Sequence, residues 1–244
     1  TAREFFISEY MRINNVNYNT AANAIDNATI TATYSGSTHT GYSINIAGLP
    51  HAGLGASYLS GTVAARNSVT VGIKDAPAVS NVKFNITGTP NNHGYTGLAV
   101  TSGTTNAIGN TYTISTNTNT SGVSGSNGIL VAGGILNNKT DGLNASSRNT
   151  VEVSGLNNDG VLVTSGTFND YETKYIVSGT GTQYTGNNGL SIKGGTVKLY
   201  HDKFEISGEH NNGLALENSA ATPVTPILYA TDFTISGRFN NGII

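Results

Sequence analysis

One repeating pattern constrains the fold of this chain more than any other feature. A short β-type strand ends in Ser-Gly, an insert of variable length follows, and an Asn-Asn-Gly or related triplet opens a second apolar strand. The glycines that open the second strands are spaced 24 to 32 residues apart: Gly97, Gly128, Gly160, Gly189, Gly213 and Gly242. A unit this small cannot bury its own apolar face, but stacked copies share one continuous core. The repeat therefore predicts a solenoid.

The spacing of the repeat also predicts the shape of one coil. A third strand fits in the gap after each second strand, as at residues 196–200 and 226–229. Three short strands and three turns describe one coil of a right-handed parallel β-helix, with coils stacked at about 4.8 Å. We expect an all-β, three-sided solenoid of about eight to nine coils, because no helical pattern of ten or more residues is present.

The regular and irregular parts of the chain are expected to form one domain, residues 1–244. Residues 81–244 carry the regular repeats, and residues 1–80 are predicted to form irregular coils. Between residues 30 and 54, two alternatives compete for one coil. Either Tyr34-Ser35-Gly36 leads to Gly41, or Ile46-Ala47-Gly48 leads to Gly53.

The asparagine-rich triplets are interpreted as structural corners. Glycine accepts positive φ without cost, and asparagine tolerates the left-handed region best among the other residues. Stacked asparagines can also form hydrogen-bonded ladders between coils. The alternative is a polar strip that binds glycans. The corner residues are Asn157, Asn158, Gly160, Asn187, Asn188, Gly189, Asn211, Asn212, Gly213, Asn240, Asn241 and Gly242.

Composition excludes several functional classes. Charged residues make up only 11% of the chain, the net charge is −2, and cysteine is absent. A basic field for nucleic acid is therefore missing, and so are disulfides, thiol catalysis and cysteine-ligated zinc. Gly, Asn, Ser and Thr form nearly half of the chain, which would suit disorder, but the repeat and the five prolines oppose that interpretation.

The search for catalytic chemistry finds little. The acidic residues Asp141, Asp159, Asp170 and Asp202 are isolated in sequence, and no serine lies in a Gly-x-Ser-x-Gly motif. The histidines mostly fall in turns and form no metal-ligand pattern. We expect no catalytic residues, no metal site, no cofactor and no enzymatic activity. Because stacked coils can bring distant carboxylates together, a polysaccharide-degrading enzyme stays the alternative.

The best candidates for binding lie in and near the inserts at residues 116–127, 136–149, 167–174 and 180–186, because loops on a rigid scaffold often carry function. Exposed tyrosines suit recognition of a protein or sugar surface. The same tyrosines could instead cap the sides of the solenoid. The candidate binding residues are Tyr171, Tyr184, Tyr200, His201, Asn138, Lys139 and Asp141.

The repeats between Lys83 and Ile244, together with low charge, no cysteine and a polar surface of small residues, resemble the passenger domains of Gram-negative autotransporters. The resemblance implies export, a C-terminal translocation barrel in the full-length protein, and display at the bacterial cell surface or secretion. Because the sequence ends inside a second strand at Gly242-Ile243-Ile244, we expect it to be part of a longer passenger.

The expected function follows from this resemblance. We expect a binding protein, an adhesin that contacts a host-cell surface protein or glycan through solenoid faces and loops and that binds no nucleic acid. Self-association, in which passengers aggregate cells by binding copies of themselves, is the alternative within the same class. A structural spacer is a third possibility.

Overall fold

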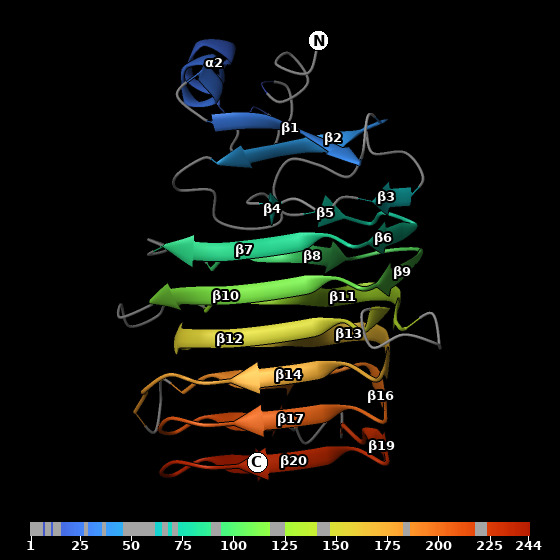
Figure 1. Ribbon diagram of the computed structural model, residues 1–244, viewed down its shortest axis with the longest axis vertical. Helices are drawn as coiled ribbons and strands as arrows, with labels where there is room; N and C mark the ends of the chain where they lie inside the picture. The colour runs from blue at the N-terminus through green and yellow to red at the C-terminus, as the bar shows by residue number, and fades with distance from the viewer. Residues whose placement is uncertain are drawn as a thin grey trace.

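The computed structural model shows a parallel β-solenoid of about five turns, and not the eight to nine coils expected (Figure 1). The structure describes residues 7, 11, 16–26, 29–35, 38–45, 62–64, 68–69, 73–88, 94–117, 125–140, 147–182, 186–217 and 224–244. Five regular coils run from β7 to β19. Shorter strands precede them, and β20 and β21 follow them.

The first strand of every coil belongs to one parallel sheet of seven strands, visible as the stacked arrows in Figure 1. Apolar side chains alternate inward along these strands, so that in β12 Val151 and Val153 are buried while their neighbours are half-buried. The strands are β4 (Ser68–Val69), β7 (Lys83–Gly88), β10 (Thr111–Asn117), β12 (Thr150–Leu156), β14 (Lys174–Val177), β17 (Lys203–Ile206) and β20 (Asp232–Ile235).

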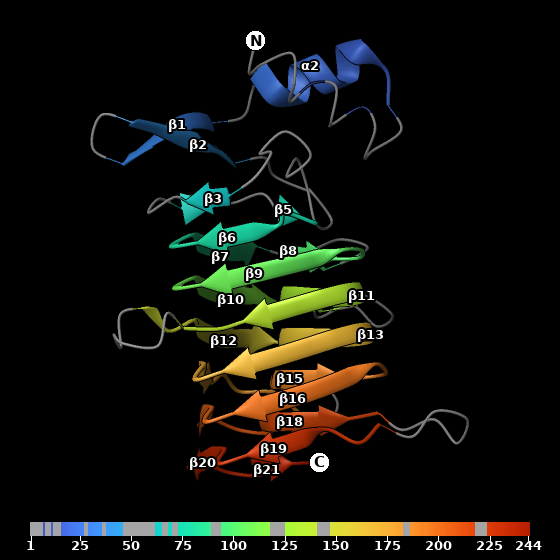
Figure 2. The same cartoon turned by 90° about the vertical axis from the view of Figure 1, so that its right-hand side faces the viewer.

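The second and third strands of the coils join in a second parallel sheet (Figure 2). In two coils they fuse into one long strand whose register shifts where a corner would be expected: β11 (Asn127–Asn138) and β13 (Asp159–Tyr171). Elsewhere they stay separate: β3 (Thr62–Ala64), β5 (Ile73–Lys74), β6 (Ala78–Ser80), β8 (Thr96–Val100), β9 (Thr104–Ile108), β15 (Asn188–Ile192), β16 (Thr196–Tyr200), β18 (Asn212–Leu216), β19 (Ile227–Tyr229) and β21 (Asn241–Ile243).

The register of the stack follows the sequence repeat. The residues on either side of each second-strand glycine pair between coils, as Asp159 pairs with Asn188 and Val161 with Leu190. Inside, aromatic rings stack along the axis, with centroids 4.3 Å apart for Tyr175 and Phe204. Burial of such apolar area supplies most of the folding free energy.

In the N-terminal part, a helix and a hairpin come first, whereas β3, β4 and β6 pair in parallel as coil strands do. Helix α2 (Tyr18–Asp26) and an antiparallel hairpin of β1 (Thr29–Ser35) and β2 (Thr38–Asn45) lie at the N-terminal end of the stack (Figure 1). The segment around Tyr34 is therefore a hairpin strand and not the first strand of a coil. The second alternative, from Ile46 to Gly53, lies outside the described residues.

These N-terminal elements account for the lower coil count, because they occupy chain that was expected to form coils. Ala21 and Ala22 of α2 are buried in the same apolar cluster as Ala76 and Val79 at the start of the solenoid. The helix and hairpin thus lie where repeat proteins need an end cap. Within the described ranges, no helix is long and apolar enough to cross a membrane.

Candidate functional site

The first asparagine of each triplet lies in a buried ladder that connects successive coils. The backbone N–H of Asn158 donates to Oδ1 of Asn187 at 3.0 Å, and the pattern repeats from Asn187 to Asn211 and from Asn211 to Asn240. The side-chain amide of Asn187 also donates to two carbonyls, those of Gly155 and Ser178. We call Asn158, Asn187, Asn211 and Asn240 the inner asparagine ladder.

The second asparagine of each triplet lies further out. The amide of Asn212 donates to Oδ1 of Asn188 at 2.9 Å, and Asn241 donates to Asn212 at 2.9 Å. Asn188 in turn donates to the Asp159 carboxylate at 2.8 Å. These side chains are half-buried or exposed, so water can replace each of their bonds.

The glycines of the triplets are not in the left-handed region, which corrects the reason given for them above. Positive φ falls on other residues of the turn, such as Asn157 (58°), His210 (59°) and the Ser-Gly glycine Gly155 (81°). The triplet glycine Gly160 is required for space. A Cβ atom there would lie 2.5 Å from the Gly189 carbonyl oxygen and 2.5 Å from Val151 Cγ1.

The opposite corner of the coil carries a column of tyrosines on its outer face. Tyr171, Tyr200 and Tyr229 are in register at the ends of β13, β16 and β19. The rings of Tyr171 and Tyr200 are stacked, with centroids 4.8 Å apart and planes 6° from parallel. Tyr229 is tilted by 48° against Tyr200, and His201 meets its edge.

A surface hollow of about 470 Å³ lies beside this column. Its lining combines the ring edges and faces of Tyr171 and Tyr200 with polar groups from the preceding coil. Lys139 is half-buried here at the start of the insert 136–149. The lining residues are Asn137, Lys139, Thr140, Tyr171, Glu172, Tyr200 and His201.

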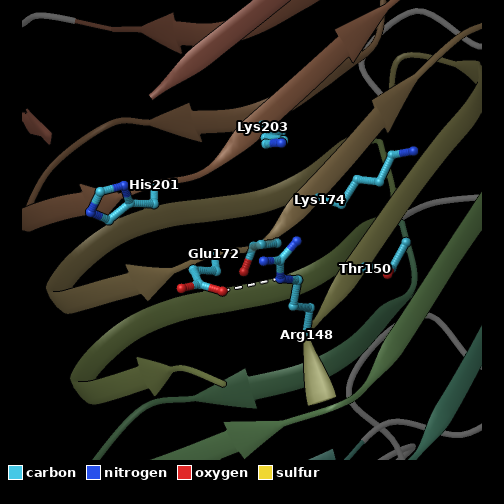
Figure 3. Close-up of a pocket in the computed structure, with 7 residues that line it drawn as sticks. Arg148, Thr150, Glu172, Lys174, His201 and Lys203 are labelled. Atoms are coloured by element: carbon cyan, nitrogen blue, oxygen red, sulfur yellow. Dashed lines mark hydrogen bonds and ion pairs between the residues drawn. The ribbon is translucent and has the colours of Figure 1, made fainter. Parts of the chain in front are cut away.

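A second hollow, of about 490 Å³, shares Glu172 and His201 with the first (Figure 3). Glu172 and His201 follow the column tyrosines, and each has positive φ, 57° and 59°, so the chain turns sharply between the hollows. Arg148 Nε donates to Glu172 Oε2 at 3.0 Å, as drawn in Figure 3. The second hollow is lined by Arg148, Thr150, Glu172, Thr173, Lys174, His201 and Lys203.

Because the two hollows share Glu172 and His201, we treat them together and call them the tyrosine groove. The insert 136–149 contributes to both parts, because Thr140 lines one and Arg148 the other. The base of this insert is held by a 2.6 Å hydrogen bond between Thr140 Oγ1 and Ser147 Oγ. Positive side chains gather at the second hollow, where Arg148, Lys174 and Lys203 outnumber Glu172.

Beneath the groove lies a buried polar cluster. Asp170 Oδ1 accepts from Asn138 Nδ2 at 2.8 Å and from Thr173 Oγ1 at 2.5 Å, and Tyr175 OH donates to Oδ2. Asp202 Oδ1 accepts from the Thr173 N–H at 2.8 Å, while its Oδ2 has no partner. Burial raises the pKa of both carboxyls, and the charge of Asp170 raises that of Asp202 further. At neutral pH we therefore expect Asp202, with a pKa of about 9, to be largely protonated, and Asp170, with a pKa of about 6 and three donors on its oxygens, to be largely ionised. Both side chains are fully buried, without access to a substrate.

The predicted binding residues have different outcomes. Tyr171, Tyr200, His201 and Lys139 lie together in the tyrosine groove. Asn138 was expected on a binding loop, but its side chain is fully buried against Asp170, because it ends β11 with its side chain inward. Tyr184 and Asp141 lie outside the described residues.

The sequence reasoning did not single out the remaining groove residues. Tyr229 could have been found, because Tyr171, Tyr200 and Tyr229 are spaced 29 residues apart, a spacing that occurs within the repeat. Arg148, Glu172 and Lys203 carry no such signal, since only the fold brings them together. Among the described residues, no three His, Cys, Asp or Glu side chains are grouped as a metal site.

Comparison with known proteins does not assign the chain to a family. No protein-family model matches the sequence, and no curated protein or solved structure matches it either. Its function must therefore be argued from the tyrosine groove itself.

Proposed function

We propose that this chain is part of a right-handed β-helical passenger of the autotransporter type, displayed at the bacterial surface or secreted, and that it acts as a binding protein toward a host-cell surface. The single observation that carries the proposal is the tyrosine groove, in which Tyr171 and Tyr200 stack beside a hollow of about 470 Å³. Tyrosine offers a large amphipathic contact at low entropic cost.

The arrangement suits binding along the solenoid. Tyr171, Tyr200 and Tyr229 repeat once per coil in register, so they present equivalent contacts at regular intervals to an extended ligand. Linked weak contacts of this kind add avidity without a deep pocket. With a net charge of only −2, the surface relies on hydrogen bonds, rings and local charge rather than on a long-range field.

A cell-binding titration tests this function. We expect the labelled chain to bind epithelial cells saturably, and the double variant Tyr171→Ala/Tyr200→Ala to lose at least about tenfold in affinity, since stacking contacts at a binding surface are large contributors. Tyr18→Ala is the matched control, because Tyr18 is exposed on α2 and lines neither hollow. Absence of saturable binding, or turnover of a polysaccharide by the chain, would contradict the proposal.

Self-association is a second candidate, supported by a row of asparagines on the same sheet as the tyrosines. Asn137 Nδ2 donates to Asn106 Oδ1 at 3.2 Å, and Asn169 Nδ2 donates to Asn137 Oδ1 at 3.0 Å. Because Lys198 and Ala78 lie at the two ends of this row within the stack, a second molecule would pair with it side by side and not end to end. Concentration-dependent dimers in sedimentation velocity that disappear in Asn137→Asp/Asn169→Asp would support this candidate, and a monomer at all concentrations would exclude it.

A further inference from the structure

We infer that the tyrosine groove binds an acidic oligosaccharide, with the tyrosines packing against a sugar ring and lysines holding its carboxylate or sulfate groups. This inference rests on the proposed binding function and specifies its ligand. It combines three observations: a ring face with no aromatic partner among the described residues, a polar lining, and lysines that form no ion pair with a described acid.

The first observation concerns Tyr171. One face of its ring is stacked on Tyr200. Its other face points toward the preceding coil. There Asn138 is the register partner of Asp170, so the next residue, Lys139, lies beside Tyr171. That side of Tyr171 therefore has no ring against it, and 38% of the residue is exposed. An apolar face of a sugar ring can pack there, as flat apolar groups do on aromatic side chains.

The second observation is the lining around these rings. Apart from the tyrosines, the first hollow is lined by side chains with hydroxyl, amide or charged groups, including Asn137 and Thr140. The second adds Thr150 and Thr173. Donors and acceptors spread over several walls suit a ligand with hydroxyl groups on every side. An apolar peptide segment would remove water from this polar lining without offering it hydrogen bonds, which costs free energy.

The third observation is the charge balance. Arg148 is paired with Glu172 at 3.0 Å, and Lys174 with Glu205 at 2.9 Å. Among the described residues, Lys139 and Lys203 form no such ion pair. One lies in each hollow, so within the described part of the chain each hollow holds one lysine outside an ion pair, in a chain whose net charge is −2; the register partner of Lys203 is Asp232. This local excess favours an anionic ligand over a neutral one.

The carboxylate and the sulfate have different sources but share the chemistry of an anionic oxygen group on a sugar. Lysine binds either as a point charge. The probes must therefore include both kinds of acid, with a neutral oligosaccharide of similar length as the reference.

The test is isothermal titration calorimetry of the full chain with a sulfated heparin hexasaccharide, a carboxylated hexagalacturonate and neutral maltohexaose. We expect at least one acidic oligosaccharide to bind tenfold or more tightly than maltohexaose, with an affinity that falls as salt rises. The oligosaccharide that binds most tightly identifies sulfate or carboxylate as the preferred acidic group. Equal affinities for all three, or tighter binding of an acidic peptide such as hexaglutamate, would overturn the inference.

Variants locate the site. Lys139→Gln and Lys203→Gln should each lower the affinity for the acidic oligosaccharide by about three- to tenfold. Lys193→Gln is the matched control, because Lys193 is exposed as Lys203 is, is paired with Glu217 and lines neither hollow, so this variant should leave the affinity unchanged. Tyr171→Ala should lower the affinity for the acidic oligosaccharide at every salt concentration, since salt does not screen the stacking of a sugar on a ring. Unchanged affinity in all three groove variants would contradict the assignment.

The outcomes separate this inference from the proposed function. A chain that binds cells through Tyr171 and Tyr200 but binds neither acidic oligosaccharide overturns the ligand assignment and leaves the binding function standing. A chain that binds an acidic oligosaccharide through the groove but binds no cell supports the ligand assignment and contradicts the host-cell function.

Discussion

The asparagine corner and the tyrosine corner of the solenoid differ in two ways: how regularly their residues repeat from coil to coil, and how far their side chains are exposed. At the inner asparagine ladder, Asn158, Asn187, Asn211 and Asn240 take the same position in four successive coils, Ser126 takes it in the coil before them, and the first three asparagines are buried. At the tyrosine groove, the residues that follow the column differ from coil to coil: Glu172, His201 and Ala230. The side chains there are half-buried or exposed.

The difference separates scaffold from surface. A buried polar residue at the same position in successive coils satisfies backbone groups that these coils share, and water cannot reach to replace it. At the tyrosine groove the backbone does not depend on one kind of side chain for its hydrogen bonds, so the side chains can vary. The groove holds tyrosine rings, lysines and a histidine. We propose that the ladder position maintains the fold, and that the tyrosine groove, where the residues after the tyrosines vary from coil to coil, carries binding.

The largest expected effect comes from removing one member of the inner ladder. Asn187→Ala leaves the N–H of Asn158 and the carbonyls of Gly155 and Ser178 without partners in a buried place. We expect a loss of about 3 kcal/mol in the free energy of unfolding, measured by urea denaturation.

Its neighbour Asn188 is the matched control. Asn188→Ala removes bonds to Asp159 and Asn212 at a half-buried position where water can enter, so the loss should stay below about 1 kcal/mol. Equal losses for the two variants would show that the inner and outer asparagines do not differ as the account requires.

A somewhat smaller effect is expected from filling the space at Gly160. The added methyl group of Gly160→Ala would approach Val151 Cγ1 and the Gly189 carbonyl within 2.5 Å, and we expect a loss of about 2 kcal/mol. Gly103→Ala has open space but a φ of 65°, so it should lose only about 1 kcal/mol through backbone strain. Thermal melts of the two variants would decide between a packing role and a conformational role for the triplet glycine.

The next effect depends on pH and concerns the acids beneath the groove. Burial raises the folded-state pKa of Asp202, so the folded protein binds more protons than the unfolded chain above about pH 4. Stability should therefore decline as pH rises from 4 to 8. Asp202→Asn removes this titration, and we expect it to be more stable than the wild type at pH 8 by at least about 1.4 kcal/mol, the equivalent of one pKa unit.

The control for this measurement is Asp232→Asn, since Asp232 is exposed in β20 and is not in the buried cluster. Its urea midpoint should follow the wild type at each pH. If the stability advantage of Asp202→Asn over the wild type shrinks as pH rises, Asp202 is not a buried acid that is protonated in the folded state.

The smallest effect on stability is expected at the tyrosine column itself. Tyr171→Ala removes one stacked pair on an outer face, worth under about 1 kcal/mol in folding. Circular dichroism melts should place it close to the wild type, and closer still for Tyr171→Phe, which keeps the ring. A loss comparable to that of Asn187→Ala would mean that the tyrosines cap the solenoid and belong to its scaffold.

The sequence predicted the stack and its register because they depend on local pattern. Alternating apolar residues and a recurring glycine determine which strands can lie on one another, so β16 and β19 were expected almost at their observed bounds. The N-terminal region follows a different rule. Thr29–Ser35 and Thr38–Asn45 are separated by Gly36-Ser37, a two-residue hairpin signal that competes with coil formation.

The groove was predictable only in part. Tyr171 and Tyr200 could be selected as exposed aromatics near an insert, and His201 as their neighbour. Asn138 faces inward as its register partners Ala107 and Asp170 do, but the polar pair Asn137-Asn138 carries no apolar alternation that would show which of the two faces the core. Arg148, Glu172 and Lys203 meet because three coils stack, so long-range geometry rather than spacing brings them together.

The most direct test compares one ladder variant and one groove variant in the same two assays, urea unfolding and titration with the tightest-binding acidic oligosaccharide. The account predicts that Asn187→Ala loses about 3 kcal/mol in unfolding yet keeps wild-type affinity while folded. It predicts that Tyr171→Ala/Tyr200→Ala keeps stability within about 2 kcal/mol but loses tenfold or more in affinity. If the tyrosine variant unfolds as readily as the ladder variant while its affinity is unchanged, the division between scaffold corner and binding corner is wrong.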